Sequence, residues 1–449
     1  MIVIGGGLAG SEAAWQVARR GVEVTLFEMR PSVLTPAHRT GLLAELVCSN
    51  SLGSNEIHTA SGILKEELRI YGSMVIKAAD QSRVPAGQAL AVDRERFAIW
   101  VTNAVENHPL ISVRREVVET LPEGEVVVIA SGPLTAEPLT KAIVSLTKED
   151  VLHFYDAVSP IVTADSLDLE HIFGGSRYER GTTSFDYLNA PMNQEEYEAF
   201  WSALVSAKVA SKEIPKEEEY FEGCLPIEEL ARRGKDTLRY GPLKPVGLVD
   251  PRTGTQAYAV VQLRRENASG SLYSLVGFQT GLLWPEQRRV FRMIPGLREA
   301  EFVRYGVMHR NTFINAPRIL KPTLEAPTVS KATGGRVFFA GQISGSEGYV
   351  EAIATGLLAG VNASRIKRGL PLIEPPPDTM LGGLSHGMTT ESASDFQPVN
   401  ASFALLGPVM DRIKPKGSRR RGFKAKREYR MTVAKICLER ARKLANIMT

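Results

Sequence analysis

The first thirty residues contain glycines at a spacing suited to hold a dinucleotide. The run Gly5-x-Gly7-x-x-Gly10 follows the apolar residues 2–4 and precedes a helical stretch. The first glycine permits a tight turn, the second lets the backbone approach a pyrophosphate, and the third lets helix and strand pack closely. The helix N-terminus offers unpaired N–H groups to the phosphates. The next strand ends at Glu28, whose carboxylate is expected to accept hydrogen bonds from ribose hydroxyls. The expected contacts in the turn itself are Gly5, Gly6, Gly7, Leu8, Ala9 and Gly10.

A second glycine-ended strand makes FAD the expected dinucleotide. Residues 336–340 run into Gly341, followed by Gln342 where flavoproteins usually carry Asp, and a helix is expected from about Tyr349 to Arg365. The partial positive charge of that helix N-terminus would face the flavin pyrimidine ring. No second GxGxxG follows a strand, so NADPH or NADH is expected to visit an open flavin face. The cofactor contacts expected outside the first turn and Glu28 are Ser131, Gly132, Gly341, Gln342 and Gly348.

Three cysteines supply the other reactive groups. Cys48 lies in a loop rich in Ser, Asn and Gly, which favours an accessible thiol. Cys224 stands between Gly223 and Leu225-Pro226, and Cys437 is expected in the core of a helix. Without a CxxC pair, a disulfide framework or a zinc site is not expected, and no metal is predicted. Two separated thiols beside a flavin suit addition of a thiolate to an electron-poor ring, which makes the neighbouring carbon nucleophilic. Both could instead be structural.

The elements that must position these groups predict an α/β fold. We expect a Rossmann-like FAD-binding domain of the glutathione-reductase type with an inserted mixed α+β domain. The FAD-binding domain would be discontinuous, with residues 1–150 and 310–449, and the inserted substrate domain would comprise residues 151–309. Residues 31–61 are rich in Ser, Thr, Asn, Gly and Pro, and are expected to form a loop over the site.

Charge is distributed unevenly along the chain. Residues 410–449 hold fourteen Lys or Arg against three Asp or Glu, a balance of +11; since the whole chain carries +4, the remainder carries −7. A basic tail on an acidic body is typical of a surface that meets a polyanion. The alternative is a solvated basic helix.

Composition favours an intracellular protein. Hydrophobic residues make up 43% of the chain, and no apolar run reaches the length of a membrane helix. The N-terminus lacks the positively charged region and the apolar segment of a signal peptide. We therefore expect a cytoplasmic protein without membrane contact.

Several motifs together resemble the bacterial folate- and FAD-dependent tRNA (uracil-5-)-methyltransferase family, over nearly the whole chain. They are Gly5-Gly6-Gly7-Leu8-Ala9-Gly10-Ser11-Glu12-Ala13-Ala14, Cys48-Ser49-Asn50-Ser51-Leu52, Phe221-Glu222-Gly223-Cys224-Leu225-Pro226-Ile227, Met308-His309-Arg310-Asn311-Thr312-Phe313 and Ala340-Gly341-Gln342-Ile343-Ser344-Gly345. The related GidA-type flavoproteins of wobble-uridine modification share the glycine-rich start but are longer.

The resemblance implies transfer of a one-carbon unit from methylenetetrahydrofolate to the T-loop uridine of tRNA, with FAD as bound cofactor and NADPH or NADH as reductant. It assigns the addition to uracil C6 to Cys224, and leaves Cys48 as the base for the C5 proton or as a group protecting the flavin. It places His309 and Tyr349 at the folate. RNA contacts are expected at Arg419, Arg420, Arg421, Lys424, Lys426 and Arg427. Further basic clusters, with solvated surface as their alternative, are Arg264, Arg265, Arg288, Arg289 and Arg292.

Two other functions remain open at this point. One is a flavin oxidoreductase for a small molecule, with the basic tail incidental. The other is a GidA-like flavoprotein of wobble-uridine modification. The oligomeric state is not predicted.

Overall fold

Strand β1 (Ile2–Ile4) lies at the centre of a parallel sheet. The computed structural model describes residues 1–179, 186–210, 225–390, 392–394, 396–413 and 423–449. Within them the sheet has the order β16-β7-β1-β2-β6, and its strand pairs are parallel. Its other strands are β2 (Val24–Phe27), β6 (Ile111–Arg114), β7 (Val126–Ile129) and β16 (Arg336–Phe339). Every residue of β7 is buried, as expected for a parallel strand covered on both faces. The predicted Rossmann-like α/β fold is confirmed.

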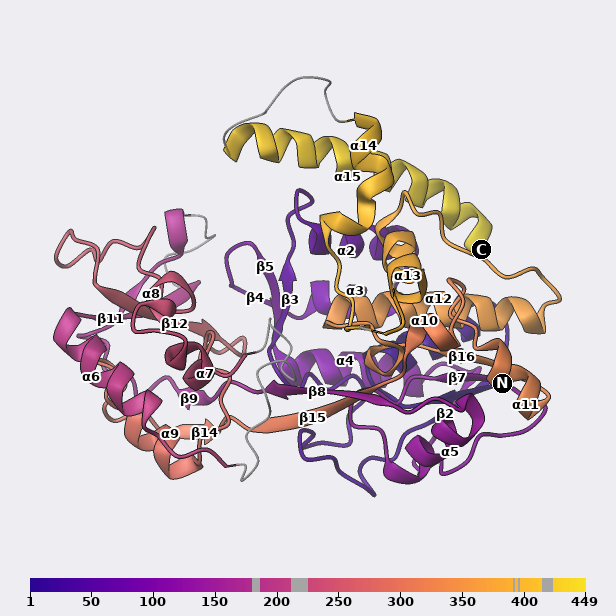
Figure 1. Cartoon of the computed structure of the whole chain (residues 1–449), viewed down its shortest axis with the longest axis horizontal. Coiled ribbons are helices and arrows are strands. Elements are labelled where there is room, and N and C mark those ends of the chain that lie inside the picture. The colour runs from indigo at the N-terminus through magenta and orange to yellow at the C-terminus, as the bar shows by residue number, and fades with distance from the viewer. Residues whose placement is uncertain (180–185, 211–224, 391, 395, 414–422) are drawn as a thin grey trace.

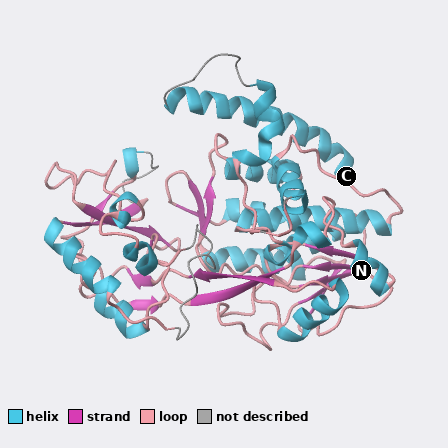
Figure 2. Ribbon diagram, in the orientation of Figure 1, coloured by secondary structure: helices cyan, strands magenta, loops and turns pink. Residues whose placement is uncertain are grey.

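Helices surround this sheet (Figures 1 and 2). Polar residues cap several of them: the side chains of Thr59, Ser73 and Asp93 accept N–H groups at the starts of α2, α3 and α4. The helices are α1 (Leu8–Ala18), α2 (Ala60–Ile70), α3 (Met74–Gln81), α4 (Arg94–Glu106), α5 (Glu137–Thr147), α10 (Ala316–Ile319), α11 (Pro327–Thr333), α12 (Tyr349–Lys367), α13 (Met380–Thr390), α14 (Gly407–Ile413) and α15 (Phe423–Met448).

A second hydrophobic core is built on an antiparallel sheet of order β10-β11-β12-β13-β9-β14. Its strands are β9 (Ile161–Thr163), β10 (Phe173–Gly174), β11 (Tyr187–Met192), β12 (Ala259–Arg265), β13 (Leu272–Leu275) and β14 (Phe302–Arg304). Helices α6 (Gln194–Val205), α7 (Ile227–Arg232), α8 (Thr237–Tyr240) and α9 (Trp284–Phe291) accompany it. The buried residues of this core run from Val162 to Ala300. The division into residues 1–150 with 310–449 and an inserted 151–309 stays our proposal for the domain boundaries.

A two-stranded ribbon joins the two cores. Strand β8 (Leu152–Ala157) pairs antiparallel with β15 (Met308–Phe313), and His309 stands opposite Asp156. Figure 1 shows this ribbon running from the large sheet to the smaller lobe. A small sheet of β3 (Ser51–Ser54), β4 (Arg83–Val84) and β5 (Ala89–Val92) lies beside it. The sequence predicted a loop over residues 31–61; the structure forms strand β3 within that range and begins α2 at Ala60.

The C-terminal helix α15 is anchored by its own apolar face. Val433, Cys437, Ala441 and Leu444 are buried at helical spacing, which confirms the core position expected for Cys437. Arginines near the C-terminal ends of α1 and α12 donate to carbonyls at the end of the chain: Arg20 to Met448, Arg365 to Ile447 and Arg368 to Thr449. Positive groups at a helix C-terminus are stabilising. Among the described helices, none combines the length and apolarity needed to cross a bilayer.

Candidate functional site

The glycine turn after β1 has the geometry of a phosphate cradle. Gly5 has φ +102°, and a Cβ there would stand 2.4 Å from the Ala130 carbonyl oxygen. A Cβ on Gly10 would stand 1.7 Å from the Gly5 oxygen, so only glycine fits either position. A Cβ on Gly7, the N-cap of α1, would meet nothing within 4 Å. The N-terminus of α1 therefore faces open space that a phosphate can enter.

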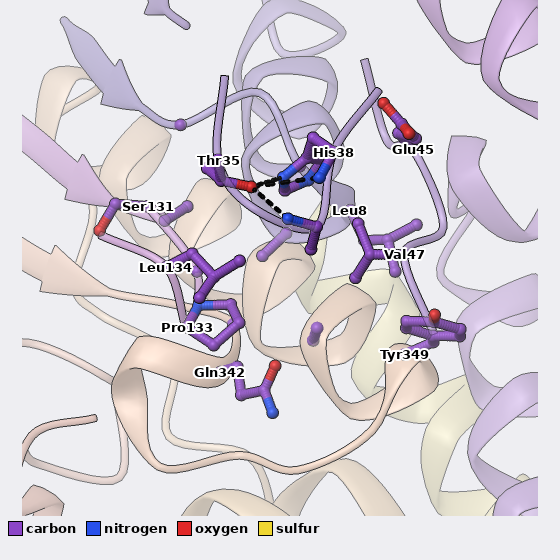
Figure 3. Close-up of a pocket in the computed structure, with 18 of the residues that line it drawn as sticks. Leu8, Thr35, His38, Glu45, Val47, Ser131, Pro133, Leu134, Gln342 and Tyr349 are labelled. Atoms are coloured by element: carbon purple, nitrogen blue, oxygen red, sulfur yellow. Dashed lines mark hydrogen bonds between the residues drawn. The ribbon is translucent and has the colours of Figure 1, made fainter. Parts of the chain in front are cut away.

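This cradle is one end of a cavity of about 430 Å³, a size in the range of small-molecule and cofactor sites. Gly5, Gly7, Leu8, Ala9 and Glu28 line it, whereas Gly6 and Gly10 lie behind the wall. Ser131, Gly132, Gly341, Gln342 and Gly348 line it too. Figure 3 shows side chains from the loop after β2, from the turn after β7 and from the start of α12 around one space. The structure thus brings most of the predicted cofactor residues together.

Close packing of α1 against α12 sets the distance between the glycine turns that follow β1 and β16. A Cβ on Gly356 would stand 2.3 Å from the Ala9 carbonyl oxygen, and one on Gly360 would stand 2.6 Å from that of Ala13. Helices α1 and α12 therefore touch backbone to backbone. Gly341, at the end of β16, is held against α1 by the same packing, since its Cβ would stand 2.9 Å from that of Ala9.

Glu28 is buried at the end of β2 and is already well satisfied. Its oxygens accept the N–H of Gly6 (2.8 Å) and three donors of Arg30 at 2.9–3.1 Å. Burial acts to raise the pKa of this carboxyl, but hydrogen bonds and charge from Arg30 outweigh it and hold the pKa below its ordinary value. Four donors saturate a carboxylate, so a ribose hydroxyl must share Glu28 with Arg30.

The Cys48 thiol reaches the same cavity and is held as a neutral group. Its Sγ lies 3.7 Å from the carbonyl oxygen of Ala157. Burial first, and then the charge of Asp156, raises the pKa of the Cys48 thiol well above its ordinary value, although Arg94 and Arg304 oppose this. At neutral pH Cys48 is therefore a thiol rather than a thiolate, which its polar neighbours in the sequence did not indicate.

Arginines from both cores clamp the loop that carries Cys48. Arg94 donates to the carbonyls of Leu46 (2.6 Å) and Cys48 (3.0 Å), and its Nε lies 2.5 Å from Glu266 at the end of β12. Arg304 donates to the Val47 carbonyl at 2.5 Å.

Arg264 extends the clamp, donating to the side chains of Asn50 (2.8 Å) and Ser49 (2.7 Å). The sequence marked Arg264 and Arg265 only as members of a basic cluster; both are half-buried where the two cores meet.

His309 and Tyr349 line the same cavity as Cys48. The Tyr349 hydroxyl accepts the backbone N–H groups of Cys48 (2.8 Å) and Ser49 (3.1 Å), so this tyrosine also holds the loop. His309 is 8% exposed, and its Nε2 has no hydrogen-bond partner among the described residues. Burial, and secondly the charge of Arg304, lowers the pKa of His309 to about 4. The imidazole is therefore neutral at pH 7.

The cavity contains chemical groups that sequence reasoning missed. Glu347 is buried and accepts a hydrogen bond from the amide of Gln342; burial and then the charge of Asp156 raise the pKa of its carboxyl well above the ordinary value. His38 accepts or donates a hydrogen bond at 2.6 Å to Thr35, as Figure 3 shows, and burial lowers its pKa to about 4. No motif singles out these residues, because only the fold brings their segments together.

A buried amine lies directly behind the wall. Lys65 is fully buried on α2, and its Nζ donates to the Leu52 carbonyl (2.7 Å) and the Ser61 hydroxyl (2.6 Å), both of which line the cavity. Burial lowers the pKa of Lys65 to about 7.

Some predicted residues lie outside the described part of the chain. Cys224 is one, as are Arg419, Arg420 and Arg421, and the side chain of Lys424 is not described either. Lys426 and Arg427 are exposed at the start of α15. Three positions after Cys224, the Ile227 N–H donates to the carbonyl of Gln279 (2.7 Å), a residue that lines the cavity.

Comparison with known proteins agrees with this arrangement. Residues 1–371 match the family Glucose inhibited division protein A. The chain is 56% identical, over 94% of its length and 95% of the relative, to methylenetetrahydrofolate--tRNA-(uracil-5-)-methyltransferase TrmFO of Moorella thermoacetica. It is likewise 56% identical, over 93% of each chain, to the protein of the same name from Symbiobacterium thermophilum.

Among solved structures, two crystal forms of Aquifex aeolicus GidA share the fold. They superpose with TM-scores of 0.66 and 0.63 at 16% identity, covering 100% and 99% of this chain and 74% and 89% of the respective GidA chains. This likeness supports the expected Rossmann-type fold with its insertion. Because the high identities extend over nearly all of both chains, the chain belongs to the GidA family and, within it, to the methylenetetrahydrofolate--tRNA-(uracil-5-)-methyltransferases.

Proposed function

We propose that the protein converts a T-loop uridine of tRNA to 5-methyluridine, with methylenetetrahydrofolate as carbon donor and NADPH or NADH as reductant. The C5–H bond of uracil is replaced by a C–CH₃ bond. The donated carbon arrives as a methylene group, so two electrons are needed to make it a methyl group, and the nicotinamide supplies them. The C5 proton leaves to a base. Bound FAD supplies the redox and one-carbon chemistry between these substrates.

One observation carries the proposal: a single cavity joins the glycine cradle at Gly7 to a second group formed by Cys48, His309 and Tyr349. The first group suits a dinucleotide and the second suits chemistry on an aromatic ring. Together with the relatives of 56% identity, this favours a methyltransferase over a small-molecule oxidoreductase.

The residues fit FAD. We infer that the N–H groups at Gly7 and Leu8 bind the pyrophosphate, where a Cβ would find open space. Glu28 would bind the adenosine ribose in exchange for one of its Arg30 contacts. The backbone at Gly341 and Gly348, with Gln342, Ser131 and Gly132, would line the ribityl and flavin end.

Cys224 is our candidate for addition to C6 of uracil, which is what makes C5 nucleophilic. The tie between Ile227 and Gln279 brings the segment after Cys224 to the cavity wall. Cys48 rests as a neutral thiol, so it can accept the C5 proton only after losing its own; its alternative role is to protect the flavin intermediate.

His309 and Tyr349 would form the folate side of the cavity. The neutral imidazole of His309 can stack on a pterin without carrying charge into the site. Exposed Lys426 and Arg427, with the preceding Arg419, Arg420, Arg421 and Lys424, would contact tRNA phosphates.

The direct test is to incubate FAD-loaded protein with NADPH, ¹³C-methylene tetrahydrofolate and an unmodified tRNA transcript, and then to analyse the nucleosides by mass spectrometry. Labelled 5-methyluridine is expected in the T loop. If NADPH reduces the flavin and no 5-methyluridine forms, the proposal is wrong. Labelled carbon at a wobble uridine would assign the protein to the GidA-like alternative instead.

A second experiment tests the nucleophile. RNA that contains 5-fluorouracil should form a covalent complex with the holoenzyme, because fluorine cannot leave C5 as a proton does. Cys224→Ala should abolish this complex, with Cys437→Ala as the control. Persistence of the complex in Cys224→Ala would move the nucleophile to another residue, with Cys48 next.

A further inference from the structure

A ladder of stacked rings stands at the edge of the second core. Trp284, the first residue of α9, lies parallel to Tyr305 with ring centroids 5.3 Å apart and planes inclined by 13°. Tyr305 stacks in turn on Phe302 at 5.4 Å and 14°. Phe302 contacts Phe291, which is fully buried. The buried Phe291 therefore anchors the inner end of the stack, while Trp284 at the outer end is 58% exposed.

A positive charge accompanies the exposed ring. Arg288, one turn along α9, donates from Nε (3.2 Å) and Nη2 (2.8 Å) to the Tyr305 hydroxyl and is exposed. Within the described ranges no carboxylate pairs with it, whereas the neighbouring Arg289 pairs with Glu286 at 2.6 Å. The structure therefore places a guanidinium that no described carboxylate neutralises next to Tyr305, the ring on which the exposed Trp284 stacks.

Two chain segments connect this ladder to the cavity. Gln279 and His309 line the cavity, and Trp284 and Tyr305 lie five and four residues from them along the chain. The segments are locked side by side, because the Gln287 amide donates to the carbonyls of Leu282 (2.7 Å) and Gly306 (2.9 Å). Even fully extended, five residues span only about 18 Å. The exposed ring therefore lies within reach of a nucleotide strand whose target base enters the cavity.

We propose that Trp284, backed by Tyr305 and flanked by Arg288, is a stacking platform for an unpaired base of the RNA substrate near the target uridine. This rests on the proposed function. Single-stranded nucleic acid is bound by aromatic rings that stack on bases, together with cations that contact the backbone. An exposed ring near an arginine that pairs with no described carboxylate has the chemistry for one base and its phosphate. A target base must also leave its own stack to enter the cavity, which leaves neighbouring bases without partners.

The test compares RNA binding by the FAD-loaded holoenzyme and its variants. The probes are a fluorescein-labelled T-arm hairpin and a duplex of the same stem without the loop, followed by anisotropy at several salt concentrations. Trp284→Ala should weaken binding of the hairpin roughly 5- to 150-fold and leave the duplex unchanged. Trp284→Phe should retain most of the affinity because phenylalanine still offers an aromatic ring to the base. Trp284→Leu keeps an apolar side chain but has no aromatic ring, and should bind the hairpin as weakly as the alanine variant.

Salt separates the two parts of the platform. Trp284→Ala should leave the slope of log K against log salt unchanged, because stacking releases no counterions, whereas Arg288→Gln should make the slope shallower by about 1. Tyr240→Ala is the matched control: Tyr240 is 81% exposed in the same lobe and takes part in no ring pair within the described residues. It should bind both probes as the wild type does.

The outcomes distinguish this inference from the proposed function. Equal hairpin affinity in the wild type and Trp284→Ala, equal losses for hairpin and duplex, or a wild type that does not prefer the hairpin would each overturn the platform. In turnover, Trp284→Ala should raise KM for tRNA with little change in kcat or in flavin reduction by NADPH. A wild type that binds the hairpin through Trp284 but forms no 5-methyluridine would refute the methyltransferase and leave the RNA platform standing.

Discussion

The character of Cys48 depends on groups distant in the sequence. Its thiol faces the Ala157 carbonyl, its N–H group and carbonyl are bound by Tyr349 and Arg94, and burial raises its pKa. Local sequence around Cys48 is polar and predicted an accessible, reactive thiol. The tertiary structure instead leaves Cys48 half-buried near the charge of Asp156, and burial and this charge keep the thiol protonated.

Removal of the Tyr349 hydroxyl should loosen the Cys48 loop. Tyr349→Phe leaves the N–H groups of Cys48 and Ser49 without their acceptor, at a cost of about 1–3 kcal/mol for each group that water does not reach. We expect a lower free energy of unfolding and faster alkylation of Cys48 by iodoacetamide, measured in a Cys224→Ser, Cys437→Ser background. Tyr240→Phe, at an exposed site, should change neither quantity. An unchanged alkylation rate in Tyr349→Phe would contradict this role.

His309 should make the fold less stable in acid. Its pKa in the folded protein is about 4, below the ordinary value of about 6.5, so between these values only the unfolded chain takes up the proton. Stability is therefore complete above about pH 6.5 and falls as the pH drops towards 4, by up to about 1.4 kcal/mol per pH unit. Urea unfolding at intervals from pH 7 to 4.5 should show a shallower fall in His309→Gln than in the wild type. Parallel curves for the two proteins would refute this.

At the scale of elements, the contact between α1 and α12 decides where the cofactor site lies. Gly356 and Gly360 bring α12 against the carbonyls of Ala9 and Ala13, which places both helix N-termini at the same cavity. The small residues of α12 thus have a packing role. Their effect on a bound nucleotide is indirect.

Gly356→Ala should therefore separate the helices and weaken FAD binding. Its Cβ would stand 2.3 Å from a backbone oxygen that cannot rotate away, and overpacking of this kind costs roughly 1–3 kcal/mol. We expect a lower Tm and a lower flavin-to-protein absorbance ratio after purification. Gly407→Ala is the control, because Gly407 has a helical φ of −44° and open space around it. Full flavin content in Gly356→Ala would show that the close approach of the helices is not needed.

At the scale of the whole molecule, the site lies where two cores meet. The β8–β15 ribbon carries Asp156 and His309 between them, and Arg94 with Glu266 ties the Cys48 loop across the junction. Helix α15, across the top of the larger lobe in Figure 1, holds eight Lys or Arg against two Glu, and arginines from elsewhere in the chain bind its last carbonyls. Lys426 and Arg427, our candidates for contacts with tRNA phosphates, do not line the cavity that holds Cys48.

The charge of α15 should appear in the salt dependence of tRNA binding. Lys426→Gln with Arg427→Gln removes two exposed cations, and the slope of log K against log salt should become shallower by about 1 for each phosphate that is no longer neutralised. Lys141→Gln removes an exposed lysine that is paired with Glu137 and should leave the slope as it is. An unaltered slope in the double variant would remove these residues from the RNA surface.

The sequence by itself determined the parallel sheet, the dinucleotide cradle and the buried face of the last helix. These follow from local patterns: a Cβ cannot fit at Gly5 or Gly10, apolar runs predict buried strands, and helical spacing buries Cys437. Only the tertiary structure decided that His38 and Glu347 line the cavity of Cys48, with Lys65 behind its wall, and that Arg264 and Arg304 hold its loop. Their segments are far apart in the chain, and a protonation state depends on burial and charges that no local pattern encodes.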